Sequence, residues 1–239
     1  MAADVSASSR APGAWSQAAL ALVLVGLLGG GFALMARSSA AESTPSPATC
    51  SADDPSKAPG KADRGAKSPR RVSGAGLCEA LNRPDLAGLL GTPGEIPNSA
   101  SGSDSSIGLF GGKDIPHPTA EVRFDTYTVN LSATYDGHPV AGSGTYLRDA
   151  QERTVLGRPA FLYSDQTISI SFRFDGHDSK TGPGVPARAL TVALDADDSG
   201  GSFDVVVWRE DGRMPDDAAL TRVAEKVLPT VDEWAAAAK

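Results

Sequence analysis

The residues most able to do chemistry are three histidines, His117, His138 and His177. Two of them stand in matching triplets, Asp136-Gly137-His138 and Asp175-Gly176-His177, each directly after a predicted strand. If both turns met at one end of a sheet, two imidazoles and two carboxylates could bind zinc and support hydrolysis. Asp-Gly is also a common turn pair in β-hairpins, and we favour this plainer interpretation.

A second group of candidates is the acidic segment 195–204. It begins like a calcium-binding loop, with acids at the first and third positions and Gly200 at the sixth. The twelfth position holds Val206, where such a loop needs a glutamate that gives two oxygens to the metal. The sequence therefore predicts a solvated hairpin loop here and no metal site.

Other signatures of catalysis and binding are missing from the sequence. Nucleophilic catalysis needs an activated serine or cysteine beside a base, and no G-x-S-x-G motif occurs. From Val72 onward the chain holds 24 acidic and 14 basic residues, so this part would repel nucleic acid. We predict that the protein is not an enzyme, has no catalytic, cofactor or metal residues, and binds no nucleic acid.

The two cysteines, Cys50 and Cys78, are the only ones in the chain. An even number of cysteines in an exported segment indicates disulfide bonding. We predict one bridge within the chain, between Cys50 and Cys78. The alternative is that each cysteine pairs with its copy in a second molecule.

The longest apolar stretch, residues 14–36, contains no charged side chain. Its most apolar part, 18–36, would span about 28 Å as a helix, close to the hydrocarbon thickness of a bilayer. We predict a transmembrane helix over 14–36. A signal peptide cleaved between 38 and 41 is the alternative, although the apolar run is long for one.

Charge does not orient this span, because one arginine flanks each end, Arg10 and Arg37. The cysteine pair favours export of the carboxyl-terminal part. We therefore predict a single-pass protein of the cell membrane with an extracellular domain and a disordered cytoplasmic tail, 1–13. Within the span, Gly26 and Gly30 form a small-xxx-small pair, which is compatible with a weak helix dimer.

Residues 37–72 are mostly Ala, Ser, Pro, Gly, Lys and Asp, and they carry too little apolar surface to offset the entropy of ordering. We predict a disordered linker here. Its second half, 50–71, holds six basic and three acidic residues. This basic stretch could contact anionic lipid or wall polymer, or fold back on the acidic domain.

Residues 73–239 are expected to form one extracytoplasmic domain. It opens with a corner of two short helices, in which Asn82 is expected to cap the second and Gly91 with Pro93 to end it. A long loop follows over 96–118, with one short strand near 107–110. The chain closes with a kinked amphipathic helix whose apolar residues are Leu220, Val223, Val227, Leu228, Val231 and Trp234.

Between these helical ends, alternating apolar residues predict strands. The phase of the alternation changes near Asp125 and Thr126, which indicates a bulge. Segment 167–174 alternates without a break and predicts a half-buried strand; 154–156 and 160–163 predict a hairpin; and 190–194 and 203–207 predict two strands around an Asp/Gly-rich turn. We predict an α+β fold: a twisted, mostly antiparallel sheet with an N-terminal helical corner and a C-terminal helix, preceded by one transmembrane helix.

Several motifs, in this order, resemble a known family. They are the charge-free span and basic linker, then VSGAGLCEALNRPDLAGLLGTP, RTVLGRPAFLYSD, GGSFDVVVWRED and DDAALTRVAEKVLPTVDEWA. The order is similar to that in a family of single-span envelope proteins from actinobacteria that is catalogued as a domain of unknown function. More distantly, the fold is similar to the small α/β/α sandwiches of envelope lipoproteins and photosystem extrinsic proteins. Neither resemblance assigns a catalytic residue.

Two classes of function follow from the sequence. The first is a non-catalytic binding or interaction domain of the cell envelope, whose partner is an envelope protein, a polymer or an apolar ligand. The second is a metal-dependent hydrolase built on the two Asp-Gly-His turns. The first is the prediction we favour, because no complete catalytic constellation is present.

Overall fold

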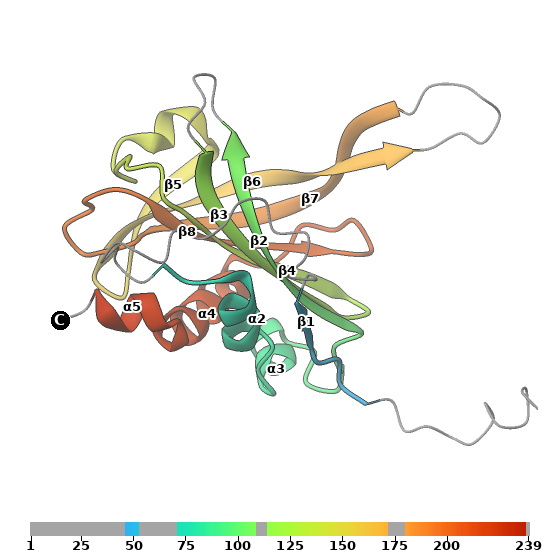
Figure 1. Ribbon diagram of the computed structural model, residues 1–239. Coiled ribbons are helices and arrows are strands. Elements are labelled where there is room, and N and C mark those ends of the chain that lie inside the picture. Colours follow the sequence, from blue (N-terminus) through green and yellow to red (C-terminus); the bar gives the residue numbers. More distant parts are fainter. Residues whose placement is uncertain (1–45, 53–70, 109–113, 172–179, 238–239) are drawn as a thin grey trace, which may run out of the picture. The chain divides into compact units, whose positions relative to one another are not determined.

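The computed structural model describes residues 46–52, 71–108, 114–171 and 180–237. The chain divides into two compact units, Met1–Ser46 and Pro47–Lys239, and nearly all described residues belong to the second. Its elements are β1 (Cys50–Ala52), α2 (Gly74–Leu81), α3 (Leu86–Leu90), β2 (Ser99–Gly108), β3 (Asp114–Arg123), β4 (Tyr127–Thr134), η2 (Ser143–Tyr146), β5 (Arg148–Val155), β6 (Arg158–Ser171), β7 (Lys180–Ala193), β8 (Ser202–Arg209), α4 (Asp217–Val227), η3 (Leu228–Thr230) and α5 (Asp232–Ala236) (Figure 1).

Eight strands form one sheet in the order β1-β2-β3-β4-β8-β7-β6-β5. Neighbouring strands are antiparallel except β1 and β2, which are parallel. Helices α2 to α5 gather on one face of the sheet (Figure 1). The prediction of an α+β fold with a mostly antiparallel sheet and a C-terminal helix is confirmed.

The connection from β4 to β5 passes three strands and contacts the face opposite the helices. Gly144, in η2, lies so close to the ring of Phe161 on β6 that an added Cβ would collide with it. Phe161 alternates with Leu162, which belongs to the core on the helix side. We call the rest of this opposite face the open face.

The core lies between the sheet and the helices. Val129 and Leu131 of β4 pair with Val207 and Val205 of β8, and all four side chains are fully buried. Burying each such side chain stabilises the fold by about 1.5–3 kcal/mol. The alternating apolar residues from which these strands were predicted are thus the residues that face the core.

The helical corner forms as predicted except at its cap. Ser73 caps α2 by accepting a hydrogen bond from the backbone N–H of Gly76, and Gly91 ends α3 in the left-handed conformation that glycine allows. Asn82 ends α2 and does not begin α3, so the prediction for Asn82 is wrong. Its side-chain amide donates to the carbonyl of Ala48, a tertiary contact that no local pattern indicates.

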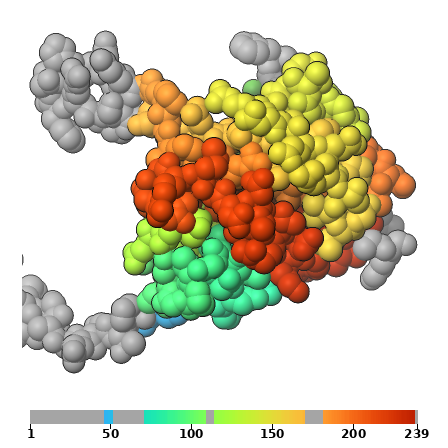
Figure 2. All heavy atoms as spheres, turned by 180° about the vertical axis from the view of Figure 1, so that it is seen from behind, coloured from blue at the N-terminus to red at the C-terminus, as the bar shows by residue number. Residues whose placement is uncertain are grey.

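The C-terminal helix has the predicted buried face and is interrupted where predicted. Asp216 caps α4, and the apolar residues predicted to face the core are all buried. Pro229 lies in η3, which separates α4 from α5 because proline cannot continue an α-helical hydrogen-bond ladder. These helices lie beside the helical corner, where Arg222 donates to the carbonyl of Leu89 (Figure 2).

The long loop predicted over 96–118 is wrong, because most of this stretch belongs to β2 and β3. β2 contains a glycine, Gly102, where an added Cβ would collide with the backbone of Gly74, so the start of α2 sits directly on the strand. β3 contains Pro116 and Pro118 in the part that pairs with β2 but not with β4. Proline is tolerated where a strand lacks a neighbour on one side, so local propensity misled the prediction.

The bulge predicted near Asp125 and Thr126 is also wrong. These residues form the turn of the hairpin between β3 and β4, in which the backbone N–H of Phe124 donates to the carbonyl of Tyr127. The change of phase comes from a reversal of the chain, not from an extra residue in one strand.

The predicted hairpin between β5 and β6 exists, but it turns one residue earlier. Leu156 and Gly157 have positive φ angles of 49° and 83°, as in the two-residue turns that connect twisted strands. Arg158 and Pro159, predicted in the turn, begin β6. The two strands predicted around the Asp/Gly-rich turn are β7 and β8.

Strands β6 and β7 continue beyond the sheet as a two-stranded arm, residues 165–171 and 180–186 (Figures 1 and 2). Segment 167–174 was predicted to be half-buried, but Ile168 is 74% exposed. The strand extends past its neighbour β5, so nothing among the described residues covers Ile168 from that side. Residues 172–174 lie outside the described residues.

The predicted transmembrane helix, 14–36, and the tail, 1–13, lie outside the described residues. Within the described parts of the chain, no helix is long and apolar enough to cross a bilayer. Of the segment predicted as a linker, 37–72, the structure describes 46–52 and 71–72, and Cys50–Ala52 forms β1 on the edge of the sheet.

Candidate functional site

The disulfide between Cys50 and Cys78 is present, which confirms the predicted pairing within one chain. Cys78 is fully buried in α2, and Cys50 lies in β1. β1 is further fixed by the hydroxyl of Ser51, which donates to the carbonyl of Ala100. The bridge therefore ties the sheet edge to the first helix of the domain.

The first Asp-Gly-His triplet, 136–138, forms a turn that is held by a hydrogen bond within the triplet. The backbone N–H of His138 donates to a carboxylate oxygen of Asp136, and the His138 side chain is 78% exposed. The turn leads into the connection from β4 to β5, so it is not a hairpin between paired strands. His177 lies outside the described residues, and among those that the structure describes no three His, Cys, Asp or Glu side chains are placed to hold a metal.

The acidic segment 195–204 forms the predicted hairpin loop between β7 and β8. Its carboxylates bind the chain itself: Asp198 accepts hydrogen bonds from the backbone N–H groups of Val140 and Ala141, at 2.8 and 2.7 Å. Asp195 accepts from the backbone N–H of Ser199 at 3.1 Å and from its hydroxyl. Asp195 therefore stabilises the loop, and Asp198 holds the β4–β5 connection.

One acid of this segment, Asp204, belongs to a polar group on the open face. Its carboxyl accepts from the hydroxyls of Thr191 and Ser202, and the Thr191 hydroxyl lies 3.5 Å from the hydroxyl of Tyr163. Burial raises the pKa of Asp204, and it also raises the pKa of Tyr163 to about 12. Burial therefore disfavours the charged form of the Asp204 carboxyl.

Replacing Asp204 with Asn is expected to stabilise the protein at neutral pH. Because the pKa of Asp204 is higher in the folded than in the unfolded state, the free energy of unfolding falls as the pH rises from 3.8 through the folded-state pKa. The Asp204→Asn variant has no carboxyl to titrate at this position, so its free energy of unfolding should be higher than that of the wild type at pH 7. The two free energies should converge below pH 3.8. Denaturant titrations at several pH values measure the difference.

Asp195→Asn is the matched control, because hydrogen bonds from Ser199 lower the pKa of Asp195. Its stabilising contribution is present above pH 3.8 and lost as the pH falls through the lower folded-state pKa, so this variant should be less stable at pH 7. The interpretation of Asp204 fails if both substitutions shift stability in the same direction.

The open face also holds a shallow apolar hollow of about 310 Å³ at the root of the arm. It is lined by side chains from four strands: Asn130, Asp165, Gln166, Thr167, Ile168, Ala187, Val206 and Trp208. A register shift between Gln166 and Ile168 in β6 brings Ile168 to this side. We call these eight residues the arm-root hollow. An apolar concavity with a few polar groups at its rim is the usual form of a small binding site.

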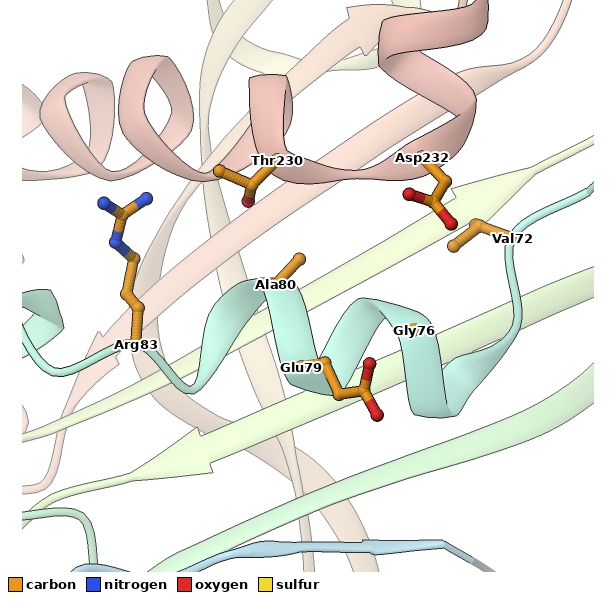
Figure 3. Close-up of a pocket in the computed structure, with 7 residues that line it drawn as sticks. All are labelled: Val72, Gly76, Glu79, Ala80, Arg83, Thr230 and Asp232. Carbon is orange, nitrogen blue, oxygen red and sulfur yellow. The ribbon is translucent and has the colours of Figure 1, made fainter.

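A second concavity, of about 280 Å³, lies between α2 and the segment η3–α5 (Figure 3). Arg83 stands at one end of it and Asp232 near Val72 at the other (Figure 3). Two of its polar side chains are engaged within the fold: Arg83 donates to the carbonyl of Lys226 at 2.5 Å and to Asp85, and the hydroxyl of Thr230 donates to the carbonyl of Val227. Four of its seven lining residues are polar or charged, whereas the arm-root hollow has Ile168, Val206 and Trp208 in its lining, so the arm-root hollow is the better candidate for an apolar ligand.

Two arginines, Arg158 and Arg188, are buried, and the sequence did not predict their burial. Arg158 is 3% exposed, stacks 3.3 Å from the centre of the Trp234 ring, and donates to the carbonyls of Leu194 and Trp234. Burial lowers the pKa of Arg158. Arg188 is 5% exposed and binds Asp217 through two hydrogen bonds of 2.6 and 3.0 Å. Both dock the C-terminal helices on the sheet, and an isolated arginine in a sequence gives no sign of such burial.

Comparison with known proteins places the chain in a family without assigning it a reaction. No curated protein and no solved structure matches the chain. A family model described as "Family of unknown function (DUF6215)" matches residues 9–150, more than half of the chain. The match includes the apolar stretch 14–36, both cysteines and the elements from β1 to the start of β5. The protein therefore belongs to the DUF6215 family, a family of unknown function.

Proposed function

We propose that the protein is a single-pass protein of the actinobacterial cell envelope, anchored by the span at 14–36, whose external domain binds a partner without catalysing a reaction. The length and uniform apolarity of 14–36 support the anchor. The disulfide between Cys50 and Cys78 supports an oxidising compartment for the domain.

The arm-root hollow is the observation that supports a binding role. It combines the half-buried indole of Trp208 with Val206 and the exposed Ile168, so apolar surface is left in contact with water. Covering such surface is favourable by roughly 25 cal/mol per Å². The ligand that fits is an apolar group, such as an acyl chain or the side chain of an envelope protein, with Asn130 and Asp165 at the rim for polar contacts.

The test is photo-crosslinking from the hollow in intact cells. Ile168→Cys is labelled with a photoreactive maleimide that does not cross membranes, and irradiation is expected to give a discrete adduct. Labelling occurs only if the domain is external. Val206→Asp in the same background should suppress the adduct, because a carboxylate in the hollow opposes an apolar ligand.

Leu156→Cys is the matched control. Leu156 is 49% exposed and lies in the β5–β6 turn, away from the lining of the hollow. It should be labelled equally but give no discrete adduct. Failure of both cysteines to react in intact cells would contradict the external location, whereas equal adducts from both would contradict a site at the hollow.

A further inference from the structure

The arm-root hollow contains a gap between an aromatic ring and a carboxylate. Ala187 of β7 pairs with Trp208 of β8 on one side and with Asp165 of β6 on the other. Cross-strand partners point to the same face of a sheet, so only the buried methyl group of Ala187 lies between these two side chains. Neighbouring strands are about 4.8 Å apart, so about 10 Å separates the strands that carry Trp208 and Asp165. Stacked groups lie about 3.5–4.0 Å apart, and the gap therefore has room for one flat group on the indole.

Asp165 is the charged residue in the lining of the hollow. It is exposed, and its carboxylate accepts a hydrogen bond from the backbone N–H of Gln166 at 2.8 Å. No ion pair among the described residues involves Asp165. The hollow thus presents a carboxylate that can accept from a ligand.

Three basic residues on the surrounding strands do not neutralise this carboxylate. Arg188 of β7 points to the opposite face, where it binds Asp217. Arg123 of β3 pairs with Glu121 at 3.7 Å. Arg148 lines a separate hollow next to β5 and forms no ion pair with another described residue. The charge that the described residues present at the arm-root hollow is therefore negative.

The same domain already contains an arginine held between an aromatic ring and an acid. The guanidinium of Arg209 lies 4.8 Å from the centre of the Tyr127 ring and donates two hydrogen bonds to Asp211, at 2.9 and 2.7 Å. At the hollow, Trp208 and Asp165 provide the ring and the acid. No basic side chain among the described residues stacks on Trp208. The hollow thus has two parts of such a set, and the cation has to come from a ligand.

Resting on the binding role proposed above for the hollow, we propose that its ligand is an arginine side chain of another envelope protein. The flat guanidinium lies on the Trp208 ring and donates to the carboxylate of Asp165, and the methylene groups contact Ile168 and Val206. Arginine suits this site because it combines an apolar stem with a planar cation that stacks and hydrogen-bonds at the same time.

A basic side chain suits the hollow better than a lipid. A volume of about 310 Å³ is near the lower end of the range of about 300–1,000 Å³ for ligand sites, so one side chain fills it. The carboxylate of Asp165 opposes an anionic headgroup. From Val72 onward the chain holds 24 acidic and 14 basic residues, which attracts a basic protein surface before contact.

The test follows the indole N–H signals of the full-length, detergent-solubilised protein by NMR during addition of acetyl-arginine amide. The chain has three tryptophans, and the signal that is lost in Trp208→Phe identifies Trp208. Acetyl-citrulline amide has the same shape without the charge and is the matched probe. The arginine probe should half-saturate the shift of the Trp208 signal at a concentration lower by about fivefold or more.

Asp165→Asn should abolish the difference between the two probes. Glu152→Gln removes an exposed charge from β5, away from the lining of the hollow, and should leave the difference unchanged. An unchanged Trp234 signal shows that each variant is folded. The proposal is overturned if neither probe shifts the Trp208 signal, if both do so equally, or if the difference survives Asp165→Asn. Tighter binding of acetyl-lysine amide would overturn the choice of arginine.

A second measurement adds Asp165→Asn to the Ile168→Cys crosslinking variant in cells. A protein partner gives an adduct that migrates as a larger species on a gel, and Asp165→Asn should lower its yield by about fivefold. An adduct that migrates with the unmodified chain would indicate a lipid and overturn a protein source. An adduct that Asp165→Asn leaves undiminished would overturn the arginine assignment while the hollow remains a binding site, so this failure differs from failure of the proposed function.

Discussion

Replacing both Cys50 and Cys78 with serine is expected to lower the free energy of unfolding by about 3.6 kcal/mol, from the chain entropy of a closed loop of about 29 residues. The bridge restricts the unfolded chain, and in the folded protein it ties β1, which pairs with β2, to α2. Domains of this kind are stabilised by about 5–15 kcal/mol in total, so the loss is a large share. Denaturant titration of the detergent-solubilised protein, followed by circular dichroism, measures it.

Ser51→Ala is the control for this prediction. It removes one hydrogen bond of β1, to the carbonyl of Ala100, and should cost only about 1 kcal/mol. If the double serine variant loses no more than Ser51→Ala, the bridge does not stabilise the domain in the way that we describe.

Trp234→Ala is expected to be the most damaging single substitution in the C-terminal helices, with a loss of about 3–5 kcal/mol. The Trp234 ring is 6% exposed, lies 6.0 Å from the ring of Phe203 and is stacked by Arg158. Truncation leaves a cavity beside a buried guanidinium that has lost its aromatic partner. Thermal and denaturant unfolding of the purified protein provide the measurement.

A double-mutant cycle separates the stacking from the packing. Trp234→Phe retains most of the apolar contact and should cost much less than Trp234→Ala. Arg158→Met removes the cation and keeps a long apolar side chain. If the effects of Trp234→Ala and Arg158→Met simply add, the two side chains are not coupled, and the stacking contributes nothing measurable.

The elements that could be predicted are those whose apolar residues face one core. In β4 and β8 the residues that face the core are every second residue, and in α4 they recur every three or four residues. Both periodicities can be read from the apolar residues of the sequence. β2 and β3 were missed because β2 contacts the core through Ala100 and glycine, and β3 contains prolines where one side of the strand is free.

The candidate site was beyond sequence prediction for a different reason. The arm-root hollow joins Asn130, Ile168 and Trp208, which meet only because β8 and β7 are inserted between β4 and β6 in the sheet. The acidic residues that the sequence offers as metal ligands have local structural roles. Asp136, Asp195 and Asp198 accept hydrogen bonds from backbone N–H groups. The cysteine pair was predictable because parity and compartment limit the choices to two.

The position of the disulfide also determines where mechanical load enters the domain. With the proposed span at 14–36, only residues 37–49 separate the membrane from Cys50, so the reach is at most about 45 Å. A pull on the membrane side passes through the bridge into buried Cys78 and α2, without peeling β1 from the sheet. The bridge closes the chain between Cys50 and Cys78 into a covalent loop, so a load applied on the membrane side bypasses that loop.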